Sequence, residues 1–279
     1  MIGTFIISWR ESIEAALLVG ILMVYLKKIR QQKHFVYIYL GVFLGIAFSI
    51  LFGYLSNQVS FLFEGIREDL FAAVILLLAV IMLTYMVIWM SDQAKHIKGH
   101  YHQKIDAAFE QNKLLTLSFL AFTGVFREGI ETVLFLWGIL IQNQGAASFS
   151  LALASGLAGL FLAIVMAWLF FKGFGFLDLR QFFNITGLIL LFMSAGMLVA
   201  AVGKLESAGL ISPIQNHVWN STWLIDEQSL FGHILSGFLG YRAKPSLMEI
   251  LAYILYFVAI SLWLRKPFSK PAGSKALVN

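Results

Sequence analysis

The pattern R-E-x-x-E occurs inside an apolar stretch of the chain between Ile2 and Leu26, as Arg10, Glu11 and Glu14 in SWRESIEAALL. A charge in the centre of such a stretch costs about 2.5–3.5 kcal/mol on insertion into a membrane, so its presence calls for a role. On a helix Glu11 and Glu14 share one face, and Arg10 lies one turn before Glu14. We therefore expect Arg10 to pair with Glu14 and to leave Glu11 available for another partner.

The same pattern returns with a shift of 117 residues, as Arg127, Glu128 and Glu131 in FREGIETVLFLWGI. Together the two copies place four carboxylates against two guanidinium groups, and a bound cation would offset the excess of negative charge. Carboxylates are hard oxygen donors, and the chain has no cysteine to supply a thiolate ligand. Ferric iron fits this donor set best, with ferrous iron and manganese as alternatives. The competing interpretation is that both copies are structural ion pairs between helices.

The composition indicates the elements that carry these motifs. Of 279 residues 59% are hydrophobic and 13% are charged, which is typical of a polytopic membrane protein. Hydropathy predicts an all-α fold with seven transmembrane helices, at residues 2–26, 36–56, 69–90, 114–141, 148–171, 182–203 and 247–264.

Basic residues gather in three of the segments that join these spans: the first loop, the third loop and the C-terminal tail. Positive loops stay on the cytoplasmic side, so we expect the N-terminus outside and the C-terminus inside. The net charge of +5 and the pI of about 9.3 are explained by these loops, and we expect no nucleic-acid partner.

The spans themselves repeat. Residues 1–95 form repeat one and residues 114–206 form repeat two, because the spans that follow each motif keep nearly the same offset. Three crossings per repeat invert the second copy, which is the 3+3 plan of many secondary transporters with a site near the membrane midplane. An outer loop at 207–246, the seventh span at 247–264 and a cytoplasmic tail at 265–279 complete a single membrane domain.

At the two R-E-x-x-E motifs, in the first and fourth spans, the chain resembles the oxidase-dependent iron permease family, in its bacterial EfeU-type branch. The later GYRAKPSLMEILAYILY is similar to the same branch. The resemblance implies high-affinity iron uptake across the cytoplasmic membrane, and no enzymatic activity or cofactor. It implies that iron is bound by Glu11, Glu14, Glu128 and Glu131.

In the same way the resemblance gives Arg10 and Arg127 the role of supports. It also implies two partners that this chain does not contain, an extracytoplasmic iron-binding protein and a haem peroxidase. A permease for manganese or lead is the first alternative. A membrane di-iron oxidase is the second, although the spans lack the E-x-x-H pairs that such sites use. No nucleotide-binding motif is present, so transport driven by ATP hydrolysis in this chain is not expected.

Several polar residues outside the motifs are weaker candidates. Asp92 and Glu206 end the third and sixth spans and are predicted vestibule ligands, with ordinary helix-end charges as the alternative. His96, His100 and His102 lie in the third loop, where a solvated loop is the simpler interpretation. SLFGHILSGFLGY, within the outer loop, is too short to span a membrane and predicts an interfacial or re-entrant helix.

Overall fold

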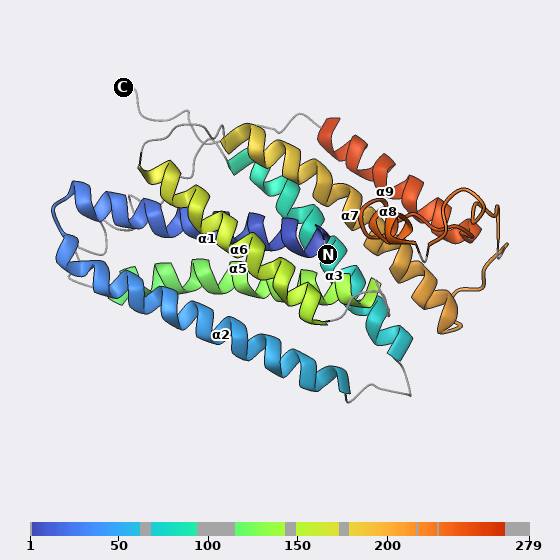
Figure 1. Cartoon of the computed structure of the whole chain (residues 1–279), viewed down its shortest axis with the longest axis horizontal. Coiled ribbons are helices and arrows are strands. Elements are labelled where there is room, and N and C mark those ends of the chain that lie inside the picture. Colours follow the sequence, from blue (N-terminus) through green and yellow to red (C-terminus); the bar gives the residue numbers. More distant parts are fainter. Residues whose placement is uncertain are drawn as a thin grey trace, which may run out of the picture.

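The computed structural model describes residues 2–61, 68–93, 115–142, 149–172, 179–215, 217–227 and 229–265, and most of these residues lie in helices (Figure 1). They contain eight α-helices and one short 3-10 helix: α1 (Ile2–Lys28), η1 (Gln32–His34), α2 (Phe35–Phe61), α3 (Glu68–Gln93), α5 (Leu115–Gln142), α6 (Phe149–Phe171), α7 (Leu179–Ser207), α8 (Leu230–Leu239) and α9 (Leu247–Arg265).

Each of the seven apolar runs coincides with a helix, and the expected bounds differ from the observed ones by a few residues. A helix satisfies its own backbone hydrogen bonds, which is what a segment in hydrocarbon requires. Within the described residues, four segments are long and apolar enough to cross a membrane: Gln32–Ser56, Glu68–Ile88, Ser150–Leu169 and Gln181–Ser207. The apolar stretch Leu247–Trp263 is shorter, and α1 and α5 are interrupted by their charges. The fold is therefore all-helical and polytopic, while the count of seven spans stays a prediction.

The helices pack in pairs that join the two predicted repeats. α1 packs mainly against α6, α2 against α5 and α3 against α7, and α1 also crosses α5. Consider a two-fold axis that exchanges α1 with α5, α2 with α6 and α3 with α7. It converts the α1–α6 pair into the α5–α2 pair, and it leaves the α3–α7 and α1–α5 pairs unchanged. The pairing therefore supports the predicted repeat, whose inversion across a membrane remains a prediction.

Glycines make the exchanged pairs possible. A Cβ added at Gly45 of α2 would lie 2.9 Å from Cβ of Val125 on α5, and one at Gly159 of α6 would lie 2.6 Å from the carbonyl oxygen of Phe5 on α1. At both places the helix backbone approaches its neighbour too closely for any side chain. Close packing of small residues is the usual way in which helices associate in lipid, where the hydrophobic effect contributes little.

A second group of contacts joins α3, α7 and α9. Tyr256 of α9 shares a hydrogen bond of 2.8 Å with Thr84 of α3, which also lies 3.2 Å from the hydroxyl of Ser194 on α7. Apolar side chains of the three helices, with Ile7 of α1 and Phe135 of α5, form the largest buried cluster. This packing holds α3 against α7 and next to the place where α1 crosses α5.

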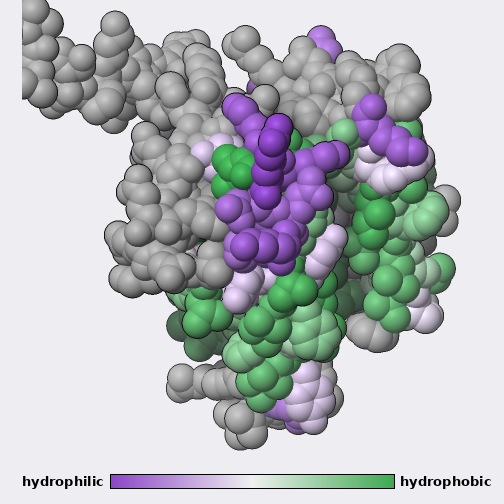
Figure 2. Space-filling view, turned by 90° about the vertical axis from the view of Figure 1, so that its left-hand side faces the viewer, coloured by the Kyte–Doolittle hydropathy of each residue, from purple (hydrophilic) through white to green (hydrophobic). Residues whose placement is uncertain are grey.

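The surface separates apolar flanks from a hydrophilic end. Large apolar side chains are exposed along α2 and α6, as expected of helices that face lipid. Figure 2 shows a hydrophilic patch at the α1–α2 turn, where Lys27, Lys28 and Arg30 are exposed. The turn is therefore suited to water, in agreement with its expected place outside the hydrocarbon.

Candidate functional site

Both motifs lie near the middle of long helices, where the helical repeat fixes the spacing of their charges. Nη2 of Arg10 lies 3.0 Å from Oε1 of Glu14, and Nε of Arg127 lies 2.8 Å from Oε1 of Glu131. The two predicted i,i+4 ion pairs are confirmed.

The expectation that Glu11 lacks a basic partner is wrong. Nη1 of Arg10 donates to Oε1 of Glu11 at 3.0 Å, so one guanidinium holds both acids of its motif. Neighbouring residues on a helix do not face each other, but the two long side chains turn towards one another inside the bundle. Arg127 is related to Glu128 more loosely, at 3.7 Å.

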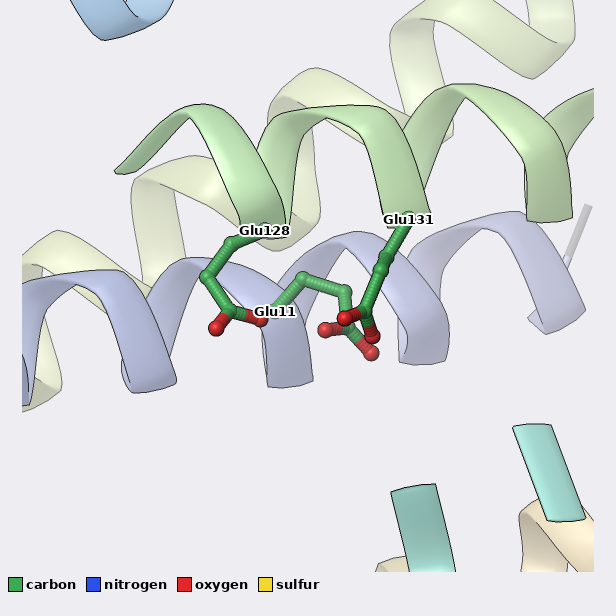
Figure 3. Close-up of side chains that lie close together, drawn as sticks. All are labelled: Glu11, Glu128 and Glu131. Carbon is green, nitrogen blue, oxygen red and sulfur yellow. The ribbon is translucent and has the colours of Figure 1, made fainter. Parts of the chain in front are cut away.

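Three carboxylates converge where α1 crosses α5. Glu11, Glu128 and Glu131 each offer an oxygen that lies within 4.8 Å of the oxygens of the other two, and all three side chains are buried (Figure 3). In each of them Oε2 is buried and has no hydrogen-bond partner. Unpaired carboxylate oxygens in a low-dielectric interior repel one another strongly. The arrangement can therefore bind a cation through oxygen.

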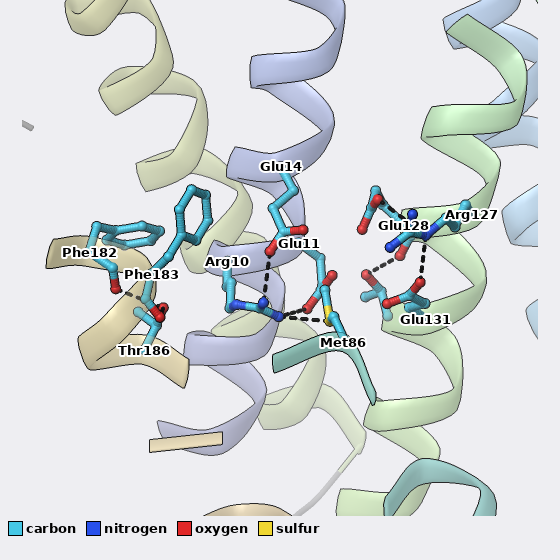
Figure 4. Close-up of polar contacts among 11 residues, drawn as sticks. Arg10, Glu11, Glu14, Met86, Arg127, Glu128, Glu131, Phe182, Phe183 and Thr186 are labelled. Carbon is cyan, nitrogen blue, oxygen red and sulfur yellow. Dashed lines mark hydrogen bonds and ion pairs between the residues drawn. The ribbon is translucent and has the colours of Figure 1, made fainter. Parts of the chain in front are cut away.

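Glu14 does not belong to this cluster of three carboxylates. Its side chain turns to Arg10, as Figure 4 shows. The structure thus brings together three of the four predicted iron ligands and places the fourth beside the guanidinium.

The two arginines differ in their surroundings. The side chain of Arg10 is 1% exposed, and its Nη1 also lies 2.9 Å from the sulfur of Met86 on α3 (Figure 4). The side chain of Arg127 is 44% exposed. Met86 was not foreseen, because a methionine in an apolar span carries no signal that it will contact a charge.

Of the two vestibule candidates, Glu206 is not part of this cluster. Glu206 accepts a hydrogen bond of 2.8 Å from the hydroxyl of Ser246, which caps α9 by accepting from the backbone N–H of Glu249. Its observed contact is therefore structural and fastens the end of α7 to the start of α9. Asp92 lies in the last turn of α3, but its side chain is outside the described part, as are His96, His100 and His102.

Comparison with known proteins shows the family of this chain. Residues 1–268 match the model of the iron permease FTR1 family, and the chain belongs to that family. It is similar to proteins named ferrous iron permease EfeU from Yersinia pestis (31% identical over 276 residues, 98% of this chain and 96% of the relative). The corresponding values are 31% over 272 residues, 97% and 94%, for Yersinia pseudotuberculosis serotype I, and 30% over 260 residues, 92% and 93%, for Escherichia coli O157:H7. No solved structure matches the chain.

The family defines the class of protein. The chain is a multi-pass membrane permease for iron, a transporter rather than an enzyme. The alternative of a membrane di-iron oxidase is thereby set aside.

Proposed function

We propose that iron crosses the membrane through the cluster of three carboxylates, with Glu11, Glu128 and Glu131 as its direct ligands. The observation that carries this proposal is the convergence of three buried carboxylates from two helices that lie far apart in sequence, each of which also has one oxygen without a hydrogen-bond partner. Glu14, expected from the resemblance to bind iron, acts instead through Arg10, which it helps to hold.

Electrostatics favours a cation as the natural occupant of the cluster. Burying an unpaired carboxylate costs several kcal/mol, and Arg10 and Arg127 compensate only part of the charge of four glutamates. A multivalent ion bound between the three carboxylates supplies the missing positive charge. When the ion leaves, the three carboxylates repel one another again, so the empty site favours binding of another cation.

The donor set bears on which ion is carried. Oxygen-only ligation suits hard cations, which supports ferric iron delivered after oxidation of ferrous iron. The relatives are named for ferrous iron, which makes the ferrous ion the second candidate. Manganese and lead remain alternatives that competition can test.

The path across the membrane follows from the predicted inverted repeat. With residues 1–95 and 114–206 as opposed halves and the N-terminus outside, the cluster lies near the midplane and is reached from either side in turn. Uptake into the cell then runs from the end where α1 begins to the α1–α2 turn. An extracytoplasmic iron-binding protein and a haem peroxidase stay predicted partners, and Asp92 and Glu206 stay predicted vestibule residues.

Uptake of radioactive iron into proteoliposomes tests the proposal. Glu11→Gln, Glu128→Gln and Glu131→Gln should each abolish uptake at unchanged protein content. Asp69→Asn is the matched control. Asp69 lies in the first turn of α3 and pairs with Lys204 in the last turn of α7, outside the cluster of three carboxylates, so this variant should leave uptake intact. Ferric and ferrous iron are supplied separately, with manganese and lead as competitors.

Two results would count against the proposal. Full uptake in the Glu11→Gln and Glu128→Gln variants would remove the cluster from the path. Equal loss in Asp69→Asn would show that any change of an acidic residue disables the protein.

A further inference from the structure

The short helix α8 lies in the segment between α7 and α9 and is closed at both ends. The hydroxyl of Ser229 accepts from the N–H of Gly232 at its start, and Gly240, with φ of 68°, ends it in the left-handed conformation. The prediction of a short apolar helix here is confirmed. Where α8 lies among the other helices could not be predicted from the sequence.

The end of α8 contacts α7 far from the C-terminal end of α7. A Cβ added at Gly196 of α7 would lie 2.9 Å from the backbone nitrogen of Gly240, so the two backbones touch. Gly196 stands eleven residues before Ser207, the last residue of α7, which places the contact about 16 Å along the helix from that end. The chain therefore leaves α7, turns back into the bundle as α8 and leaves it again to begin α9.

At this depth α8 covers the ends of the two helices that carry the carboxylates. Gln142, the last residue of α5, donates from Nε2 to the carbonyl oxygen of Ser236 at 3.2 Å, and α8 also contacts α1. Glu131 lies eleven residues before Gln142, and Glu11 lies nine residues after Ile2, so α8 stands about 15 Å from the cluster along both helices.

A buried apolar layer separates α8 from the cluster. Ile7 precedes Glu11 by one turn and Phe135 follows Glu131 by one turn, and both side chains are fully buried in the same apolar cluster. On the opposite side of the carboxylates, the shift of 117 residues places Gly124 and Leu18 at the equivalent positions. Ile7 and Phe135, between the cluster and α8, are therefore larger than their equivalents Gly124 and Leu18, between the cluster and the α1–α2 turn.

We propose that α8 is a lid, which closes the carboxylate cluster towards the end where α1 begins and must move to admit the cation; this rests on the function proposed above. The contacts that hold α8 in place are specific. Gly196 and Gly240 meet backbone against backbone, the amide of Gln142 lies beside them and donates to Ser236, and Phe238 packs, partly buried, against the large apolar cluster. Movement of α8 must break that hydrogen bond and uncover Phe238.

The base of the lid is fastened separately. Tyr241 bonds through its hydroxyl to Ser221 at 2.7 Å and to the carbonyl oxygen of Ile225 at 3.0 Å, and the N–H of Ser221 donates to the carbonyl of Ala243 at 2.9 Å. These bonds hold the stretches before and after α8 together. A swing of α8 therefore leaves the start of α9 in place.

Cross-linking tests the lid in the full-length protein, which has no native cysteine. In Gln142→Cys with Ser236→Cys, a short bis-methanethiosulfonate reagent ties α8 to α5. Iron uptake into proteoliposomes should fall to the level of protein-free liposomes, and should return after reduction and removal of the reductant. Ser221→Cys with Ala243→Cys is the control, because it links the base of the lid without tying α8 down, and its uptake should not change.

A labelling experiment tests the lid without iron and so separates it from the proposed function. Gly196→Ala displaces α8, whereas a Cβ at Gly53 of α2 makes only ordinary contacts, the nearest at 3.4 Å. The thiol of Ile139→Cys, beneath α8, should react severalfold faster with a hydrophilic maleimide in the Gly196→Ala background than in the Gly53→Ala background. Equal labelling rates, or full uptake in the protein with α8 tied to α5, would overturn the lid.

Discussion

The unequal surroundings of the two arginines predict unequal losses of stability. Arg10→Gln leaves Glu11 and Glu14 buried without their cation, whereas Arg127→Gln removes a charge that is 44% exposed. Breaking a buried ion pair by removing one partner costs about 3–5 kcal/mol. Water reaches the guanidinium of Arg127 and weakens its pair, so the loss of Arg127 should cost less, although Glu131 stays buried.

The free energy of unfolding should therefore fall by about 1.4 kcal/mol or more beyond the loss in Arg127→Gln when Arg10 is replaced by Gln, which is roughly tenfold in the unfolding equilibrium constant. Reversible unfolding in mixed detergent micelles, followed by tryptophan fluorescence, measures the difference. Adding Glu14→Gln to Arg10→Gln should recover part of the loss, because one unpaired carboxylate disappears.

Equal losses in the two single variants would contradict this prediction, because the expected difference comes from the burial of Arg10 and not from the motif. So would a double variant less stable than Arg10→Gln alone. Lys204→Gln is the control for the loss of an ordinary ion pair, and its effect should stay below about 1 kcal/mol.

Three further changes follow from contacts between helices. Gly129→Ala would place a Cβ against the side chain of Ser49, at a distance no real atoms keep, and should destabilise the protein by about 1–3 kcal/mol in the same unfolding assay. Ser49→Gly should relieve that clash, and Ser49→Ala should not, because the Cβ of residue 49 is itself too close. Tyr256→Phe removes the hydrogen bond to Thr84 and should cost about 1 kcal/mol, whereas an unchanged midpoint would make that bond irrelevant to stability. Asp69→Asn breaks the partly exposed ion pair with the end of α7, so its effect should be under about 1 kcal/mol and should vanish in high salt.

Local geometry explains what could be predicted from the sequence. Apolar runs of about 20 residues form helices in a bilayer, so the bounds of the helices could be predicted to within a few residues. The pairs Arg10–Glu14 and Arg127–Glu131 follow from the 3.6-residue repeat alone and hold whatever surrounds them.

What depends on neighbouring helices could not be predicted. The meeting of the two motifs was expected, but the turn of Glu14 away from Glu128 and Glu131 depends on how α1 is rotated against α5. The sulfur of Met86 reaches Arg10 only because α3 is held behind that crossing by α7. The depth of α8 depends on the pairing of Gly196 with Gly240, which are far apart along the chain.

The exchanged helix pairs have a consequence for how the protein is made. Within the described residues α1, α2 and α3 find their principal partners in α6, α5 and α7, and α1 and α2 touch each other only slightly. The first half of the chain therefore has almost no core until the second half has been synthesised. The glycines of α2 that contact α5, such as Gly45, face lipid until α5 has been inserted. Two fragments divided between α3 and α5 and produced together should assemble into a working permease, and either fragment alone should be degraded.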